Sequence, residues 1–275
     1  MIDPHIALDA IGQLPDADID IADAALQLAR VDAPEADCQA ARDHLSALAR
    51  EAVALARFVP EDDIASRARV LALLISARHG YSGDAEDYDN LDNANLIHVI
   101  ERRRGLPVAL GILWLHTARV LGWAAHGVDF PGHFLLALPG RAGNTILDVF
   151  AGGTPLDAGA LRRLVRSAEG AQADLRSGLL APMSVRAVLL RLQTNIKQRR
   201  LGAGDLAGAL ACAEDMLRIA PDAVPLWREA GLLNQRLGQA AAALHCYERF
   251  LLLAPPGEAA LRTRAAVDEL RSRLD

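Results

Sequence analysis

A repeat of 34 residues in the C-terminal third of the chain constrains its fold more than any other feature of the sequence. In a unit counted from Val224, small and aromatic residues stand at positions 4, 8, 20, 24 and 32. These residues are Trp227, Gly231, Ala243, Tyr247 and Pro255. One unit earlier, Ala209 and Pro221 stand at positions 20 and 32. A period of this length predicts stacked pairs of antiparallel helices, because one pair alone cannot bury its apolar face.

This spacing resembles that of the tetratricopeptide repeat. The resemblance implies two repeats, of which the earlier has a degenerate first helix, Val185–Arg200. A last helix, Glu258–Leu274, is expected to cap the stack, because the end of a solenoid needs a polar outer face. Cys212 and Cys246 occupy equivalent positions, roughly 8–10 Å apart in packed helices, which is too far for a disulfide. We expect both to be core residues, and a generic helical bundle remains the alternative.

The composition narrows the class of protein. Of 275 residues, 52% are apolar and 4% are aromatic, which excludes disorder and favours helix packing over a β-sandwich. The net charge of −6 argues against a nucleic-acid partner, which calls for a basic surface. No uncharged apolar run reaches about 18 residues, and the start lacks the pattern of a secretory signal. With three scattered cysteines, we expect a cytoplasmic protein with no membrane segment.

Helical periodicity dominates the first 121 residues. A polar segment, Tyr81–Asn90, interrupts it and is predicted to be a structured loop. Asn93 is expected to cap the helix that follows this loop, and Gly105 to end that helix. The predicted helices are Asp20–Arg30, Pro34–Phe58, Glu61–His79, Asn93–Arg104 and Pro107–Leu121.

The period then changes to that of short strands. Turn residues separate the predicted strands Ala124–Asp129, His133–Leu138 and Thr145–Phe150. A helix, Asp157–Ser167, follows, and the small residues after it are expected to join two domains. The sequence therefore predicts an α+β fold with a small antiparallel sheet of three or four strands in residues 1–177, and an all-α repeat array in residues 178–275.

The middle of the chain resembles the transglutaminase-like core of papain-type folds. In that core, a Cys two residues after a Gly begins a helix, an Arg and a Gly end it, and a strand His and a next-strand Asp complete the triad. The matching residues here are Gly105, Arg119, Gly122, His133 and Asp148. The arrangement has a chemical reason, since a helix N-terminus favours the thiolate and a His oriented by a carboxylate takes up the proton.

The nucleophile is missing from this pattern. Pro107 stands where the family has its Cys, and neither Val108 nor Ala109 has a nucleophilic side chain. In a serine-protease triad, loss of the nucleophile lowers turnover by a factor on the order of 10⁶. The sequence therefore argues against thiol acyl transfer.

The chain resembles more specifically the bacterial SirB family, in which a transglutaminase-like core precedes tetratricopeptide repeats. The resemblance is carried by the repeat and by the segments Tyr88–Asn93, Val99–Pro107 and Gly127–Phe134. That family commonly has Pro at the Cys position and Ser at the position of Ala109. The Ala here removes the option of a serine nucleophile, and the resemblance implies a fold more than a function.

The candidate catalytic residues are His133 and Asp148, a remnant dyad expected to face each other across an antiparallel pair of strands. The structural alternative is a buried His that a carboxylate satisfies while it holds two strands in register. Candidate binding residues are Glu101, Arg103, Tyr88 and Asn93. Glu101 and Arg103 are expected either to line a cleft or to form a surface ion pair.

We expect neither a metal ion nor a cofactor. The acidic residues around Asp84 and Asp92 lack the spacing of a calcium-binding EF-hand loop, and turn and cap roles account for them. No histidine has the three partners that a zinc site needs.

Three functional hypotheses follow. The first is a non-catalytic transglutaminase-like protein that serves as a protein-interaction or regulatory module, with a protein or peptide partner. The second is a hydrolase in which the His133–Asp148 dyad activates water or a substrate nucleophile. The third is a scaffold that acts only through its repeats. The cleft beside His133 discriminates between them, according to whether it is open or filled by Tyr88, Phe130 and Phe134.

Overall fold

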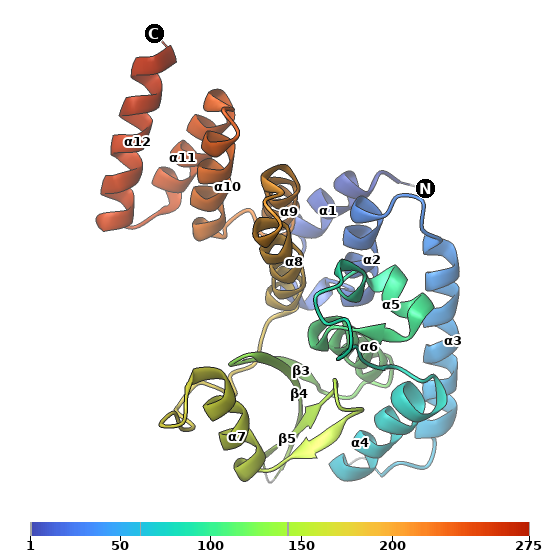
Figure 1. The fold of residues 1–275 in the computed structure, drawn as a ribbon. Helices are drawn as coiled ribbons and strands as arrows, with labels where there is room; N and C mark the ends of the chain where they lie inside the picture. Colours follow the sequence, from blue (N-terminus) through green and yellow to red (C-terminus); the bar gives the residue numbers. More distant parts are fainter. Residues whose placement is uncertain (1, 61, 142, 275) are drawn as a thin grey trace. The chain divides into compact units, whose positions relative to one another are not determined.

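The computed structural model describes residues 2–60, 62–141 and 143–274, with the side chains up to residue 272. Its contacts divide the chain into two compact units (Figure 1). The core unit is Pro15–Leu192, and the repeat unit combines Met1–Leu14 with Gln193–Asp275. The division falls inside α8 (Val185–Gly202), whereas the sequence places the domain boundary at residues 177 and 178, before this helix.

The core unit begins with helices that aspartates cap. Asp20, Asp37 and Asp63 each accept hydrogen bonds from backbone N–H groups in the first turn of the helix that follows. Asp37 explains why the second helix starts later than the predicted Pro34, and the predicted start at Glu61 lies outside the described residues. These helices are α2 (Ile21–Asp32), α3 (Cys38–Ala56) and α4 (Ile64–Ala72), and α4 continues as the π-helical segment η2 (Leu73–Arg78).

The helix before the candidate nucleophile position differs from the prediction at both ends. Asn95, not Asn93, caps α5 (Leu96–Arg102), because its side chain accepts from the N–H groups of the first turn. Arg103, not Gly105, ends the helix in a left-handed conformation with φ of 59°. Gly105 instead belongs to strand β2 (Arg104–Gly105), which pairs in parallel with β1 (Ser82–Gly83).

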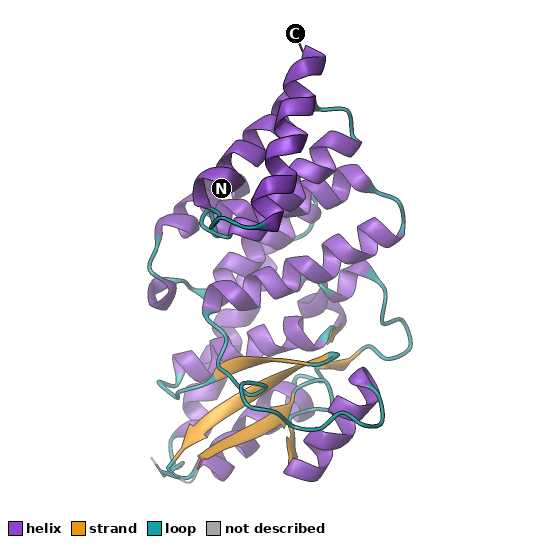
Figure 2. Cartoon of the chain, turned by 90° about the vertical axis from the view of Figure 1, so that its left-hand side faces the viewer, coloured by secondary structure: helices purple, strands orange, loops and turns teal. Residues whose placement is uncertain are grey.

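A four-stranded antiparallel sheet completes the core unit and confirms the predicted α+β class (Figure 2). Its strands lie in the order β3 (His126–Phe130), β4 (His133–Gly140), β5 (Gly143–Asp148) and β6 (Thr154–Leu156). One face packs on α7 (Ala158–Glu169), where Val128, Leu135 and Val165 belong to one buried cluster. The other face packs on α6 (Pro107–Val120), where Gly111 makes room for the ring of Phe134.

The repeat unit confirms the predicted helical array. Its helices are α8, α9 (Leu206–Ile219), α10 (Val224–Arg236), α11 (Ala240–Leu253) and the capping α12 (Glu258–Leu274). Gly231 and Tyr247 pack together as the repeat requires, since a Cβ on Gly231 would lie 2.4 Å from Cε1 of Tyr247. Cys212 and Cys246 are buried, as expected for core positions.

One helix of the repeat unit was not predicted. Helix α1 (Pro4–Gln13) packs against α9, although about 200 residues separate the two along the chain. Gly12 permits this approach, because a Cβ there would meet the carbonyl oxygen of Arg218. Asp9 adds an ion pair to the same arginine, at 2.8 Å.

Among the described helices, none combines the length and the apolar character that crossing a membrane demands.

Candidate functional site

The structure brings the two predicted dyad residues together. His133 begins β4 after a turn at Gly132, whose φ of 67° suits glycine, and Asp148 ends β5. Nε2 of His133 lies 2.9 Å from Oδ1 of Asp148, and the side chains are only 14% and 15% exposed. The carboxylate thus holds one ring nitrogen and leaves Nδ1 for another partner.

Asp148 is held as a carboxylate by the turn that follows it. Its Oδ1 also accepts hydrogen bonds from the backbone N–H groups of Phe150 and Ala151, at 3.0 and 3.2 Å. Burial opposes ionisation, but the hydrogen bond and charge of His133 and these two N–H groups together lower the pKa of Asp148 below its usual value. The carboxylate can therefore orient the imidazole.

Strand β1 connects the candidate nucleophile position with the dyad. The N–H of Gly83 donates to the carbonyl oxygen of Phe150 at 3.1 Å, and the N–H of Asp84 donates to that of Gly105 at 3.3 Å. These two adjacent residues thus hold the chain just before α6 beside the chain just after Asp148. Pro107, buried at the first position of α6, lies at this junction, where the transglutaminase-like pattern has its cysteine.

Phe150 contacts His133, and nothing in the sequence pointed to this contact. The two rings meet edge to face with centroids 6.1 Å apart, and Tyr88 meets Phe150 in the same way at 6.0 Å. Gly83 makes room for the phenyl ring, because a Cβ there would lie 2.3 Å from Cδ2 of Phe150. Of the three aromatics that could have filled the cleft, Tyr88 contacts Phe150, which in turn contacts His133.

The other two aromatics, Phe130 and Phe134, are each 2% exposed and belong to the core of the sheet.

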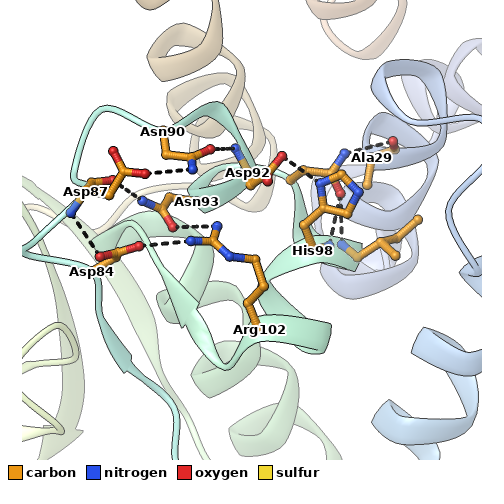
Figure 3. Close-up of polar contacts among 10 residues, drawn as sticks. Ala29, Asp84, Asp87, Asn90, Asp92, Asn93, His98 and Arg102 are labelled. Carbon is orange, nitrogen blue, oxygen red and sulfur yellow. Dashed lines mark hydrogen bonds and ion pairs between the residues drawn. The ribbon is translucent and has the colours of Figure 1, made fainter.

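Asn93 fixes the polar loop that Tyr88 belongs to (Figure 3). It is fully buried, its Nδ2 donates to the carbonyl oxygen of Asp87 at 2.7 Å, and its Oδ1 accepts from Arg102 at 3.1 Å. Arg102 also donates to Asp84 at 3.1 Å. These contacts tie the loop to α5, so the described geometry of Asn93 is that of a loop anchor.

The acidic residues of this loop contact neighbouring backbone and side-chain groups. Asp84 accepts from the N–H of Asp87, and Asn90 accepts from the N–H of Asp92, which also contacts His98 at 2.9 Å (Figure 3). Over residues 2–60, 62–141 and 143–272, no group of three His, Cys, Asp or Glu side chains is placed to hold a metal ion.

Arg103 belongs to a second polar cluster instead of contacting the dyad. Its guanidinium lies over the ring of Tyr81, 4.8 Å from the centroid, and its Nη1 contacts Nε2 of His44 at 2.8 Å and the hydroxyl of Tyr81. Glu101 is exposed on α5. The described contacts therefore link neither Arg103 nor Glu101 to His133.

The surroundings of His44 keep its imidazole neutral. Burial, reinforced by the charge of Arg103, lowers the pKa of His44 to about 4, and burial raises the pKa of Tyr81 to about 12. The phenol oxygen lies 2.9 Å from Nε2 of His44. No sequence signal pointed to this cluster, because its members are far apart along the chain and come from α3, the start of the polar loop and the end of α5.

Comparison with protein families supports this description of the two parts. Residues 39–194 match the model of the transglutaminase-like superfamily, and residues 196–275 match a tetratricopeptide repeat model. The first match covers more than half of the chain and contains the whole candidate site.

Individual relatives agree with the family matches. A UPF0162 protein of Xylella fastidiosa is 37% identical over 179 residues, which cover 64% of this chain and 64% of that relative. A UPF0162 protein of Vibrio cholerae is 29% identical, with 92% of this chain and 93% of the relative covered. A third, from Pseudomonas aeruginosa, is 31% identical, with 98% and 97% covered.

The chain has a transglutaminase-like core with a His–Asp pair, followed by a helical repeat array. The Pseudomonas aeruginosa relative matches the chain along nearly its whole length. The chain therefore belongs to the transglutaminase-like superfamily and, within it, to the UPF0162 family.

Proposed function

We propose that this protein is a non-catalytic member of its superfamily and works as a protein-interaction or regulatory module in the cytoplasm. The single observation that carries the proposal is Pro107 at the first position of α6. A proline side chain has no atom that attacks an acyl group, and Val108 and Ala109 add none.

The surroundings of the dyad support the same proposal. His133 and Asp148 are largely buried, and the ring of Phe150 meets the imidazole edge to face. The three cysteines are buried on other elements, α3, α9 and α11, so none of them replaces the missing thiol at α6. In this setting the pair serves the fold by joining the ends of β4 and β5.

The repeat unit supplies the proposed interaction surface. Helical repeats of this kind present concave surfaces that suit extended or helical peptides. The repeat unit has a cavity of about 630 Å³ lined by residues of α1, α9, α10 and α11. We infer that a protein or peptide partner binds there.

A gain-of-thiol experiment tests the catalytic half of the proposal. Wild-type protein is expected to release no ammonia from glutamine peptides and to form no adduct with thiol electrophiles directed at the site. In Pro107→Cys, the new thiol at a helix N-terminus near His133 is expected to have a pKa below the free value of about 8.5, measured from the ultraviolet absorbance of the thiolate. Adding His133→Ala is expected to raise that value again.

The matched control is Pro155→Cys, which places a thiol on the exposed strand β6 and is expected to titrate like a free cysteine. Ammonia release or hydrolysis by the wild-type protein that His133→Ala abolishes would overturn the proposal in favour of a dyad hydrolase. If the pKa of the thiol introduced at position 107 does not change when His133→Ala is added, the assignment of position 107 as the nucleophile position is contradicted.

Site-specific photocrosslinking tests the interaction half. A photoreactive residue replaces Ala242, which lines the repeat cavity, or Ala151, which lies beside the dyad, in the full-length chain. Crosslinks to a defined protein species from position 242 alone are expected. Crosslinks from position 151 alone would assign the partner to the core unit instead.

A further inference from the structure

Helix α1 lies beside α9 and contacts it through one face (Figure 1). Nε2 of His5 lies 3.5 Å from Oδ1 of Asp215. Nη1 of Arg218 donates to both carboxylate oxygens of Asp9, at 2.9 and 2.8 Å. Positions 5 and 9 lie one turn apart on the same side of a helix, and Leu8, which is fully buried, lies between them. The contact therefore combines a buried apolar side chain with two polar contacts.

Gly12 adds a steric requirement to this face. It lies three positions after Asp9 and therefore on the same side of the helix. A Cβ at position 12 would meet the backbone carbonyl oxygen of Arg218, which cannot move aside as the end of a flexible side chain can. At this point α9 thus accepts a helix whose residue has no side chain.

Helix α1 depends on this contact for its conformation. It has 10 residues, and isolated helices shorter than about 12–15 residues are marginal in water. The structure describes all ten, and the buried ones are Leu8 and Ile11. The side chains of Asp9 and Arg218 are 56% and 37% exposed, and ion pairs in such positions contribute little. We therefore expect a helix that makes more contacts to displace α1 from α9.

The chain passes from α1 directly into the core unit. The boundary between the two compact units falls between Leu14 and Pro15, one residue after the helix ends. Release of α1 from α9 thus requires a change at this connection and breaks no helix of the core unit.

We propose that this surface of α9 binds an amphipathic helix of a partner protein, and that α1 occupies the surface while no partner is bound. The partner helix would present an apolar residue, an acidic residue directly after it and a glycine three positions later, as Leu8, Asp9 and Gly12 do. The acid would pair with Arg218, which would repel a basic residue at the same place. The inference rests on the proposed interaction role and names the kind of partner.

Fluorescence polarisation of a labelled peptide tests the site in the full-length protein. The peptide consists of residues 3–14, so it keeps Asp3, which caps α1. In the wild type α1 competes in cis, which lowers the apparent affinity of the peptide. Gly12→Val releases α1 through the clash with the Arg218 carbonyl and is expected to tighten binding at least about tenfold.

The matched control is Gly257→Val in the same unit, where a Cβ meets nothing within 4 Å. It is expected to bind the peptide as weakly as the wild type does.

A charge reversal tests which group the site recognises. On the Gly12→Val protein, a peptide with Asp9→Lys is expected to bind at least about threefold more weakly than the original peptide, because its ammonium faces Arg218. Arg218→Glu in the protein changes an exposed side chain and also repels α1. This variant is expected to bind the lysine peptide more tightly than the original one, which reverses the order.

Equal binding of the original peptide to the wild type and to Gly12→Val would overturn the inference, and so would an order of the two peptides that Arg218→Glu leaves unchanged. A wild-type dimer that Gly12→Val abolishes, measured by light scattering, would assign the surface to α1 of a second copy instead of a partner protein.

The crosslinking from position 242 separates this inference from the proposed interaction role. Gly12→Val is expected to increase the crosslink to the partner at least about threefold, because α1 no longer competes. A crosslink that Gly12→Val leaves unchanged would overturn the inference and leave the interaction role standing. Absence of any crosslink from position 242 would contradict the interaction role itself.

Discussion

Nε2 of His133 lies 2.9 Å from Oδ1 of Asp148, where the first residue of β4 meets the last residue of β5. The contact joins the two strand ends just beyond the last paired residues of these strands, Leu136 and Leu147. It therefore stabilises this end of the sheet whether or not the imidazole has a catalytic role, and its strength depends on the charge of the carboxylate.

Asp148→Asn is expected to change the acid stability of the protein. The pKa of Asp148 is lower in the folded chain than the usual 3.8, so its contribution to the free energy of unfolding is present above that value and is lost as the pH falls through the folded-state pKa. Denaturant unfolding between neutral pH and strongly acidic pH is expected to show a shallower loss of stability at the acidic end for the variant than for the wild type.

Asp43→Asn is the control for this prediction, because Asp43 is an exposed aspartate of the same unit. Its acid profile is expected to follow that of the wild type. Equal acid slopes for Asp148→Asn and the wild type would mean that the pair does not stabilise the fold.

The lowered pKa of His44 predicts a second pH dependence of the free energy of unfolding, at a less acidic pH than that of Asp148. Its pKa is about 4 in the folded chain against 6.5 for a free imidazole, so the unfolded chain takes up a proton between these values and the folded chain does not. Stability is therefore expected to fall as the pH is lowered from about 6.5 to about 4. His44→Gln removes this group and is expected to make the loss of unfolding free energy in that window smaller than in the wild type.

His98→Gln serves as the comparison, because it changes a histidine of the same unit outside the cluster of Arg103 and Tyr81. It is expected to leave the wild-type slope between these pH values in place. A slope that both variants retain would show that His44 is not the group responsible.

Gly231→Ala is expected to destabilise the repeat unit. The added Cβ would lie 2.4 Å from the ring of Tyr247, and overpacking of this kind costs roughly 1–3 kcal/mol. Gly202→Ala is the matched control, because a Cβ at the end of α8 meets nothing within 4 Å. Thermal unfolding measures both, and an unchanged midpoint for Gly231→Ala would contradict the packing of α10 on α11.

Limited proteolysis is expected to cut first between Ala168 and Leu180, next to the domain boundary that the sequence predicts at residues 177 and 178. Most of this segment follows the end of α7 and has no helix or strand, and much of it is exposed. The two fragments are expected to co-elute under native conditions, because α1 of the first fragment packs on α9 of the second. A stable fragment that begins inside α8 would contradict this boundary.

The sequence by itself determined the elements that follow a local period. The 34-residue repeat placed α9 to α12, and the change to short apolar runs near Trp123 placed β3, β4 and β5. The resemblance to the transglutaminase-like pattern also paired His133 with Asp148, because that pattern places the two residues on adjacent strands. Such features are readable because each residue acts on near neighbours in the chain.

The predicted start and end of α5 were wrong because two nearby residues could fill each end position. Asn93 and Asn95 are both good capping residues, and the structure uses Asn95 as the cap because Asn93 is buried between Asp87 and Arg102. Gly105 is the usual residue for a left-handed helix end, yet Arg103 takes that conformation while its side chain stacks on Tyr81. In each case a side-chain contact that no local period predicts decided which residue ends the helix.

Only the tertiary structure decided what surrounds the candidate sites. Phe150 meets His133 edge to face where β1 binds the Phe150 carbonyl oxygen, and α1 lines one side of the repeat cavity from the opposite end of the chain. These relationships join residues whose spacing has no period, and their stability comes from burial and hydrogen bonds that exist only once the chain is folded. The sequence thus determined which groups were available, and the packing of distant segments decided which of them meet.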